Sequence, residues 1–467
     1  MTVADATPDF EQGSRDDRAF LGHPKGLGYL GFTEACERFS YYSMQTLLVL
    51  YMVNYLLVPG RMENVVGLDW LRTSFFPGLE GQPLASAIFG SYTALVYLTP
   101  IFGGIIADKW LGRNATLITG GILMAIGHFL MAVEPAFLFA LLFLLLGVGA
   151  FKGNIATQVG GLYGANDLRR AMAFQIFYIF INASVIIAPL ITGTLGQKVG
   201  WHYGFGTAGI VMVLGLIIYL SGQRYLPNES RAARAEARAT RDPMTRDDWV
   251  SLLALMLLIP VLAISLLTNQ EIFNAYLVWG DEHFALRFMN FDIPSSWLIT
   301  LDAAVSFSML VAVAAFWKWW GTTRREPDEI SKMIIGSFFT IGGGLCLFAA
   351  AATVPQGGKI GLFWPVMFHL LNSIGFAHIL PISLALFTKI APKQITATVI
   401  GLYYLAFFAA NATVGYVGGL YSSLPTTTFW LIHVASAVFG LVAFVVFKLA
   451  LGKRMAAGPQ EQAAALS

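Results

Sequence analysis

Twelve long apolar runs constrain the fold of this chain more than any other feature of its sequence. They lie at residues 28–57, 85–107, 114–133, 137–160, 172–195, 204–222, 249–279, 296–320, 331–353, 360–388, 396–420 and 427–450. A helix needs roughly 20 mainly apolar residues to cross a bilayer, and each run is close to that length or longer. Only 12% of the residues are charged, whereas soluble domains carry about 25%. The pattern predicts an all-α integral membrane protein with 12 transmembrane helices.

The positions of Lys and Arg between these runs predict how the chain is oriented. With the N-terminus inside the cell, 22 of the 29 basic residues fall in inner segments and 5 in outer segments. Cytoplasmic loops carry such an excess of positive charge. We therefore expect a multi-pass protein of the cell (inner) membrane with both termini cytoplasmic. The acidic N-terminus lacks the basic start and apolar core of a signal peptide.

One long polar segment divides the twelve runs into two sets of six. It spans residues 223–248 and is rich in Arg and Ala. Equal halves joined by a basic linker are typical of two-lobe transporters. We expect a cytoplasmic N-terminal segment at 1–27, six-helix lobes at 28–222 and 249–450, a cytoplasmic linker at 223–248 and a cytoplasmic tail at 451–467. The Ala/Arg/Glu content of the linker is compatible with a surface helix, and a solvated linker is favoured over any specific role.

The sequence offers little that would hold a metal or a cofactor. Its two cysteines, Cys36 and Cys346, lie inside apolar runs, and no CxxC pair or Cys/His cluster is present. A net charge of +2 does not indicate nucleic-acid binding. HExxH and GxSxG motifs are absent, and no polar segment is long enough for a soluble catalytic domain. We therefore expect no cofactor, no metal and no enzymatic activity.

The first apolar run carries a stripe of polar side chains. Steps of three and four residues place six of them on one side of a helix: Glu34, Glu37, Arg38, Tyr41, Tyr42 and Gln45. A charge inside a bilayer costs about 2.5–3.5 kcal/mol on insertion scales, so it needs a partner or a water-filled cavity. Glu34 and Arg38 have the spacing of an i,i+4 ion pair. Such a pair can serve only to hold helices together, but two carboxylates, one guanidinium and two phenols favour a functional site.

Further costly polar residues lie in later runs. Lys152 stands among glycines that let a ligand or a backbone come close, and about eight residues separate it from the end of its run. We favour a cavity-facing position over snorkelling to the interface. In the second half, Asp302 offers a carboxylate. A zwitterionic substrate is expected to place its carboxylate toward Arg38 and Lys152 and its amine toward Asp302. His128, His202 and His433 are interpreted as packed or interfacial residues.

Several motifs resemble those of the proton-dependent oligopeptide transporter (POT/PTR) family, a branch of the major facilitator superfamily. The first-helix signature Glu-x-x-Glu-Arg-Phe-x-Tyr-Tyr is met by Glu34, Glu37, Arg38, Phe39, Tyr41 and Tyr42. YLTPIFGGIIADKWLGRNATLITGG resembles the second-to-third helix signature. FKGN resembles Phe-Lys-Pro-Asn, with Gly153 in place of Pro, and FYIFIN resembles the fifth-helix motif that ends in Asn182. The resemblance covers nearly the whole chain.

The resemblance implies the major facilitator fold and proton-coupled import of di- and tripeptides by alternating access, by a monomer. It implies a substrate pocket formed by Arg38, Tyr41, Tyr42, Tyr97, Lys152 and Asn182. It also implies that Glu34 and Glu37 act in proton coupling. Two acids of the second half, Glu271 and Asp302, are added to the proton-coupling set.

Three positions depart from the family pattern. Gln45 replaces an Arg that often pairs across the outer gate with a seventh-helix acid, whose place falls on Asn269 or, in a register shifted by two, on Glu271. An amide hydrogen bond between Gln45 and Asn269 would then replace the gate ion pair. Phe376 stands at the place of a tenth-helix Glu and Asp302 at that of an eighth-helix Asn. We hypothesise that the amine-binding carboxylate has moved to helix eight. These changes leave open transport of another small organic anion or drug.

Overall fold

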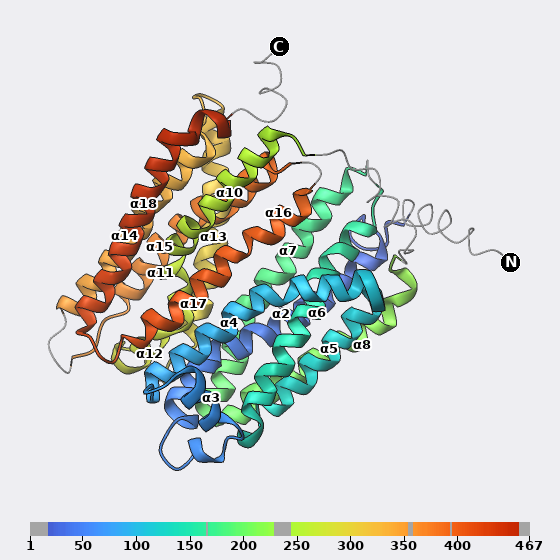
Figure 1. The fold of residues 1–467 in the computed structure, drawn as a ribbon. Coiled ribbons are helices and arrows are strands. Elements are labelled where there is room, and N and C mark those ends of the chain that lie inside the picture. The colour runs from blue at the N-terminus through green and yellow to red at the C-terminus, as the bar shows by residue number, and fades with distance from the viewer. Residues whose placement is uncertain (1–16, 165–166, 228–243, 354–357, 393–394, 457–467) are drawn as a thin grey trace. The chain divides into compact units, whose positions relative to one another are not determined.

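The computed structural model describes residues 17–164, 167–227, 244–353, 358–392 and 395–456. Figure 1 traces its helices along the chain. Most of the predicted N-terminal segment (1–16), the centre of the predicted linker (228–243) and most of the predicted tail (457–467) lie outside the described residues.

Helices account for nearly all of the regular structure in the described chain. The first part contains α2 (Lys25–Tyr51), η1 (Met52–Leu56), η2 (Met62–Asn64), α3 (Leu68–Phe75), α4 (Gly81–Ile106), η3 (Ala107–Leu111), α5 (Arg113–Leu130), η4 (Glu134–Ala136), α6 (Phe137–Gly161), α7 (Arg169–Ala188), η5 (Pro189–Gly193), η6 (Leu195–Val199), α8 (Trp201–Gly222) and η7 (Gln223–Tyr225). The second part contains α10 (Arg246–Ser265), α11 (Leu267–Gln270), η8 (Glu271–Phe273), α12 (Ala275–His283), β1 (Arg287–Phe288), β2 (Phe291–Asp292), α13 (Trp297–Gly321), α14 (Glu329–Thr353), α15 (Phe363–Ile390), α16 (Thr396–Tyr403), α17 (Leu405–Gly419) and α18 (Thr426–Ala456).

Each of the twelve apolar runs coincides with helix. Ten helical stretches of the described chain are long and apolar enough to cross a membrane, and α2 and α5 match the two remaining runs. Two runs are interrupted, which the sequence did not predict. The run 249–279 is divided into α10, α11 and α12, and the run 396–420 into α16 and α17. Apolar composition is the same on both sides of each break, so it cannot reveal where a helix is interrupted.

The chain forms two compact units. The N-terminal unit comprises Met1–Tyr51, Val58–Leu71 and Leu98–Arg241, and the C-terminal unit comprises Met52–Leu57, Arg72–Tyr97 and Asp242–Ser467. In the N-terminal unit α2 packs on α7 and α8, and α5 packs on α6 and α8. In the C-terminal unit α14 packs on α15 and α18, and α10 packs on α17 and α18 (Figure 1). The first part of α4 belongs to the C-terminal unit, where Gly90 meets the backbone of Gly415 on α17.

The last part of α4 packs against α6 with the two backbones in direct contact. A Cβ atom added to Gly103 would overlap the carbonyl oxygen of Gly149 and lie 2.9 Å from the Cα atom of Ala150. Small residues allow this close approach between membrane helices, because no side chain separates the two backbones. The neighbouring Gly104 has no other atom within 4 Å of its added Cβ. Gly103 is therefore a packing position, whereas Gly104 is not.

A small polar cluster joins the start of α2 to the end of α6 and the start of α7. The Nδ1 atom of His23 lies 2.9 Å from the hydroxyl of Tyr163. Arg169 forms an ion pair with Asp167 at 2.8 Å and donates a hydrogen bond to the carbonyl oxygen of Asp17 at 3.2 Å. These contacts tie three segments together beyond the ends of the apolar runs.

This cluster predicts a pH-dependent stability. Burial lowers the pKa of His23, and the nearby Arg169 lowers it further while Asp167 opposes the shift. The unfolded chain therefore binds more protons than the folded chain near the ordinary pKa of histidine, so the free energy of unfolding rises as pH increases through about 6.5. Between pH 7.5 and pH 5 we expect the melting temperature to fall through this residue.

The His23→Gln variant keeps a polar side chain beside Tyr163 but cannot titrate. Thermal unfolding of both proteins in detergent at the two pH values measures the difference between their slopes. An identical slope in wild type and variant would assign the pH dependence to another group.

Candidate substrate and proton site

The predicted polar stripe of α2 forms a buried ion cluster. Arg38 donates from Nη2 to Glu37 Oε1 at 2.8 Å and from Nε to Glu37 Oε2. The same Nε lies 3.1 Å from Glu34 Oε1, which is the i,i+4 pair expected from the spacing. All three side chains are buried. One guanidinium is therefore held by two carboxylates on the same helix face.

Lys152 completes the charge balance of this cluster. It lies on α6, within electrostatic reach of Glu34, Glu37 and Arg38. Two negative and two positive groups thus share one region of the N-terminal unit. The carboxylates differ in one respect, because both oxygens of Glu37 contact Arg38, whereas Glu34 Oε2 has no hydrogen-bond partner in the described chain. Oε2 of Glu34 is therefore the carboxylate oxygen of this cluster that can take up a proton without losing a hydrogen bond.

Aromatic and amide side chains extend the cluster. The Tyr41 and Tyr42 rings meet edge to face with centroids 5.2 Å apart, and the Arg38 guanidinium lies 5.3 Å from the Tyr41 centroid. Tyr42 is within electrostatic reach of Arg38 and of Tyr178 on α7. One turn further along α7, Asn182 donates to the carbonyl oxygen of Tyr178 at 2.8 Å. Sequence reasoning missed Tyr178, although it stands inside the quoted FYIFIN motif.

Three predicted residues belong to other surroundings. Tyr97 lies in the C-terminal unit and stacks on Phe407 with a centroid distance of 4.9 Å. Gln45 is buried on α2, and its Oε1 atom has no hydrogen-bond partner in the described chain. Asn269 lies on α11 and accepts a hydrogen bond from Gln270 Nε2 at 3.1 Å. The hydrogen bond between Gln45 and Asn269 stays a prediction.

Glu271 lies at the break between α11 and α12 and is fully buried. Its Oε1 accepts from the backbone N–H of Ala275 at 3.1 Å, and its Oε2 lies 3.4 Å from His433 Nε2. His433 is packed, as expected, but it also faces a carboxylate, which the sequence did not reveal. These contacts of Glu271 all lie within the C-terminal unit. The alignment of the family's seventh-helix acid with Asn269 or Glu271 stays open.

Asp302 also has a partner that the sequence did not predict. Its Oδ1 lies 3.0 Å from Nδ1 of His369, and Nε2 of His369 lies 2.8 Å from the hydroxyl of Tyr276. The three side chains come from α13, α15 and α12, and all are buried. In the sequence, these residues stand out only as polar residues inside apolar runs. Binding of a substrate amine by Asp302 stays a prediction.

The chain is similar to known membrane transporters over most of its length. The family model described as "PTR2: POT family" matches residues 114–241. A peptide transporter of Yersinia enterocolitica, YePEPT, is 29% identical over 86% of this chain and 89% of its own. A di-/tripeptide transporter of Lactococcus lactis is 27% identical over 93% of this chain and 97% of its own. The crystal structure of a mutant peptide transporter POT in complex with sulfate superposes with a TM-score of 0.81, at 25% identity, over 96% of this chain and 98% of that one.

The chain is similar to transporters of the POT family.

The protein is a multi-pass membrane protein with the major facilitator fold, built from 12 spans in two six-helix lobes. This confirms the fold class expected from the apolar runs and from the first-helix motif. The individual roles of the predicted site residues are not decided by these similarities. They stay predictions that rest on the contacts described above.

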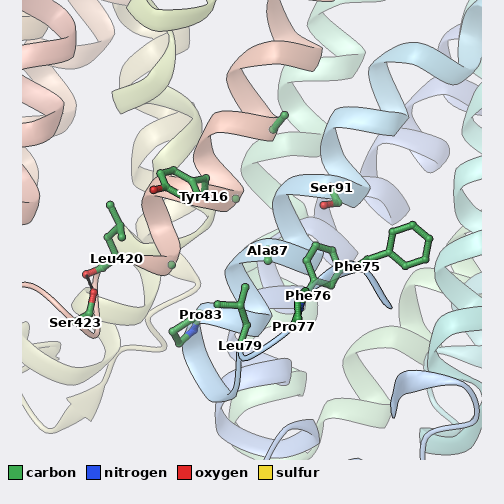
Figure 2. Close-up of a pocket in the computed structure, with 13 residues that line it drawn as sticks. Phe75, Phe76, Pro77, Leu79, Pro83, Ala87, Ser91, Tyr416, Leu420 and Ser423 are labelled. Atoms are coloured by element: carbon green, nitrogen blue, oxygen red, sulfur yellow. Dashed lines mark hydrogen bonds between the residues drawn. The ribbon is translucent and has the colours of Figure 1, made fainter. Parts of the chain in front are cut away.

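A separate apolar pocket lies in the C-terminal unit of the protein. Figure 2 shows it between the chain that follows α3, the first part of α4 and the end of α17. Its volume is about 550 Å³, and its lining includes Phe76, Pro83, Ala87, Tyr416 and Leu420. No predicted site residue lines it. Its lining carries no charged side chain, so it offers no ion-pair partner for the carboxylate or the amine of a peptide.

Proposed function

We propose that this protein is a transporter of the POT family, a proton-coupled symporter that imports di- and tripeptides by alternating access. The observation that carries the proposal is Arg38, buried between Glu34 and Glu37 and close to Lys152. A buried cation of this kind suits a substrate carboxylate that replaces one of its own carboxylates. The similar proteins of Yersinia enterocolitica and Lactococcus lactis, which are named peptide transporters, support the substrate class.

Charge balance explains how a proton and a peptide bind together. The ionised cluster is neutral, so a peptide carboxylate beside Arg38 and Lys152 adds one uncompensated negative charge. A proton on the open Oε2 of Glu34 cancels that charge and weakens the 3.1 Å contact between Glu34 and Arg38. Arg38 can then pair with the peptide carboxylate. Loss of the proton on the inner side restores the Glu34–Arg38 pair and releases the peptide.

The other predicted residues take supporting roles in this proposal. Tyr41, Tyr42, Tyr97 and Asn182 line the substrate pocket, and Gln45 and Asn269 form the outer gate. Glu271 and Asp302 contribute to proton coupling. The protein lies in the cell membrane as a monomer. Both termini are in the cytoplasm, which the excess of Lys and Arg in the inner segments supports. It carries out transport without enzymatic chemistry.

Purified protein in liposomes tests this function directly. We expect counterflow of labelled Ala-Ala without a gradient, and accumulation of Ala-Ala when an inward proton gradient is applied. Uptake that ignores the gradient would contradict proton coupling. Counterflow that excess unlabelled dipeptides fail to inhibit would indicate another substrate, such as a small organic anion or drug.

Glu34→Gln is expected to separate exchange from accumulation. The amide resembles the protonated carboxyl, so the variant should retain counterflow but lose gradient-driven accumulation by about tenfold or more. The measurement is the ratio of the two activities in the same liposomes. Glu80→Gln, at an exposed residue paired with Arg72 at 2.9 Å, is the matched control. Accumulation by Glu34→Gln at the wild-type level would remove Glu34 from proton coupling.

A further inference from the structure

Tyr276, His369 and Asp302 form a hydrogen-bonded triad that joins three helices of the C-terminal unit. The His369 imidazole contacts both of the other side chains. His369 is fully buried, with 0% of its side chain exposed. Both of its ring nitrogens have partners, the Asp302 carboxylate at 3.0 Å and the Tyr276 hydroxyl at 2.8 Å. An ionisable side chain at this depth is expensive in a membrane protein and usually functional.

The partners of His369 suit two protonation states. A carboxylate only accepts hydrogen bonds, so Nδ1 of His369 donates to Asp302. A hydroxyl can donate or accept, so Tyr276 donates to Nε2 when the ring is neutral and accepts from Nε2 when the ring is charged. Both hydrogen bonds persist when the ring gains a proton, and the negative charge of Asp302 then stabilises the imidazolium.

His378, on the same helix, shows the opposite arrangement. Its Nδ1 lies 2.8 Å from the carbonyl oxygen of Ile374, which only accepts, so Nδ1 carries the proton. Its Nε2 accepts from the indole N–H of Trp317 at 3.1 Å, and an indole can only donate. A proton on Nε2 would break that bond and place two donors face to face. The surroundings of His378 therefore hold it neutral.

His433 has surroundings of a third kind. Its Nδ1 faces the carbonyl oxygen of Phe429 at 3.1 Å, and its Nε2 faces Glu271 at 3.4 Å. A carbonyl oxygen and a carboxylate both accept hydrogen bonds, so His433 has no partner in the described chain that can switch between donor and acceptor as Tyr276 does for His369. Both side chains are 0% exposed. This pair has no exposed atom, whereas the Asp302 side chain is 13% exposed.

A proton can reach His369 through Asp302. The Asp302 side chain is 13% exposed, whereas His369 is closed. The other neighbours of the triad are mainly aromatic. The centroids of the Phe368 and Trp430 rings lie within 6.4 Å of the Tyr276 ring centroid. Among the described residues, two further titratable sites lie near the triad. Cys346 on α14 is within electrostatic reach of Tyr276, and the Glu271–His433 pair lies on the other side of Trp430. Asp302 is the acidic group in contact with the imidazole.

We propose that His369 binds a second transported proton, with Asp302 as its entrance and counter-ion and Tyr276 as the switchable partner. The proposal rests on the proposed peptide symport and adds a proton-coupling residue in the C-terminal unit. It assigns Asp302 to the imidazolium, so the substrate amine is bound elsewhere. Two protons then enter with each peptide, one through Glu34 and one through His369.

The test is the proton-to-peptide ratio, measured in liposomes as the Ala-Ala accumulation reached at steady state for a series of imposed proton gradients. Wild type should show accumulation rising with the square of the gradient, and His369→Gln should show a first-power dependence while still exchanging Ala-Ala. His378→Gln, on the same helix, is the matched control and should keep the wild-type ratio. An unchanged ratio in His369→Gln would overturn the proposal.

Asp302→Asn provides an independent readout if His369→Gln does not fold. It keeps a polar partner for Nδ1 but removes the counter-ion, so it should also lower the ratio, with little change in the half-saturating Ala-Ala concentration. An Asp302→Asn protein with an unchanged ratio and a strongly raised half-saturating concentration would make Asp302 an amine site and overturn the proposal. Failure of wild type to exchange Ala-Ala would instead reject the proposed function itself.

Discussion

Replacement of Arg38 by Met is expected to lower the initial rate of proton-driven Ala-Ala uptake by about 100-fold or more. The variant loses the cation that would bind the peptide carboxylate, and it leaves Glu34 and Glu37 buried without their shared partner. Removal of one member of a buried ion pair costs about 3–5 kcal/mol, because the remaining charge stays desolvated. Either consequence alone is large enough to stop transport.

Arg38→Lys separates charge from geometry. The ammonium keeps the positive charge but lacks the fork that contacts both oxygens of Glu37. We expect an intermediate loss of about tenfold. Arg287→Ala is the control, since Arg287 is 66% exposed and lies 3.6 Å from Asp292 on a short antiparallel strand pair. Rates are compared per folded protein after gel filtration, and Arg38→Met above a tenth of the wild-type rate would contradict the assignment.

The second large effect is expected for stability rather than for transport. Gly103→Ala places a methyl group onto the carbonyl oxygen of Gly149, and a backbone atom cannot rotate away as a side chain can. Overpacking of this kind costs about 1–3 kcal/mol, and the backbone contact favours the upper end. We expect the melting temperature in detergent to fall by roughly 3 °C.

Gly104→Ala is a control one residue away on the same helix. Its added Cβ meets no other atom within 4 Å, and alanine favours a helix over glycine by about 1 kcal/mol. This variant should be as stable as wild type or slightly more stable. Equal melting temperatures for Gly103→Ala and Gly104→Ala would show that α4 and α6 can separate without loss of stability.

Much of the fold and one half of the candidate site could be predicted from the sequence. Apolar runs mark spans directly, because a bilayer requires about 20 such residues in succession. The Glu34–Arg38 pair followed from helical spacing alone, since both residues lie on one helix. Lys152 followed from the cost of a charge inside a membrane, and the structure brings it to the same cluster.

The other half could not be predicted, because its contacts join residues on different helices. His369 was visible as a polar residue in an apolar run, but nothing in the sequence pairs it with Asp302, which lies 67 residues earlier. The partner of His433 was hidden for the same reason, since 162 residues separate it from Glu271. Glu271 lies at the break between α11 and α12. The hydropathy of the sequence does not reveal this break.

The proposed role of the Tyr276–His369–Asp302 triad affects the ratio of inner to outer peptide concentration that the cell can maintain. For a net-neutral peptide taken up with one proton, a membrane potential of about 100 mV supplies about 2.3 kcal/mol, which sustains roughly a 50-fold excess inside. A second proton doubles that free energy and squares the ratio to about 2,500-fold. With His369 as the proposed second proton site, the protein would extract peptides from more dilute surroundings, at twice the proton consumption per molecule.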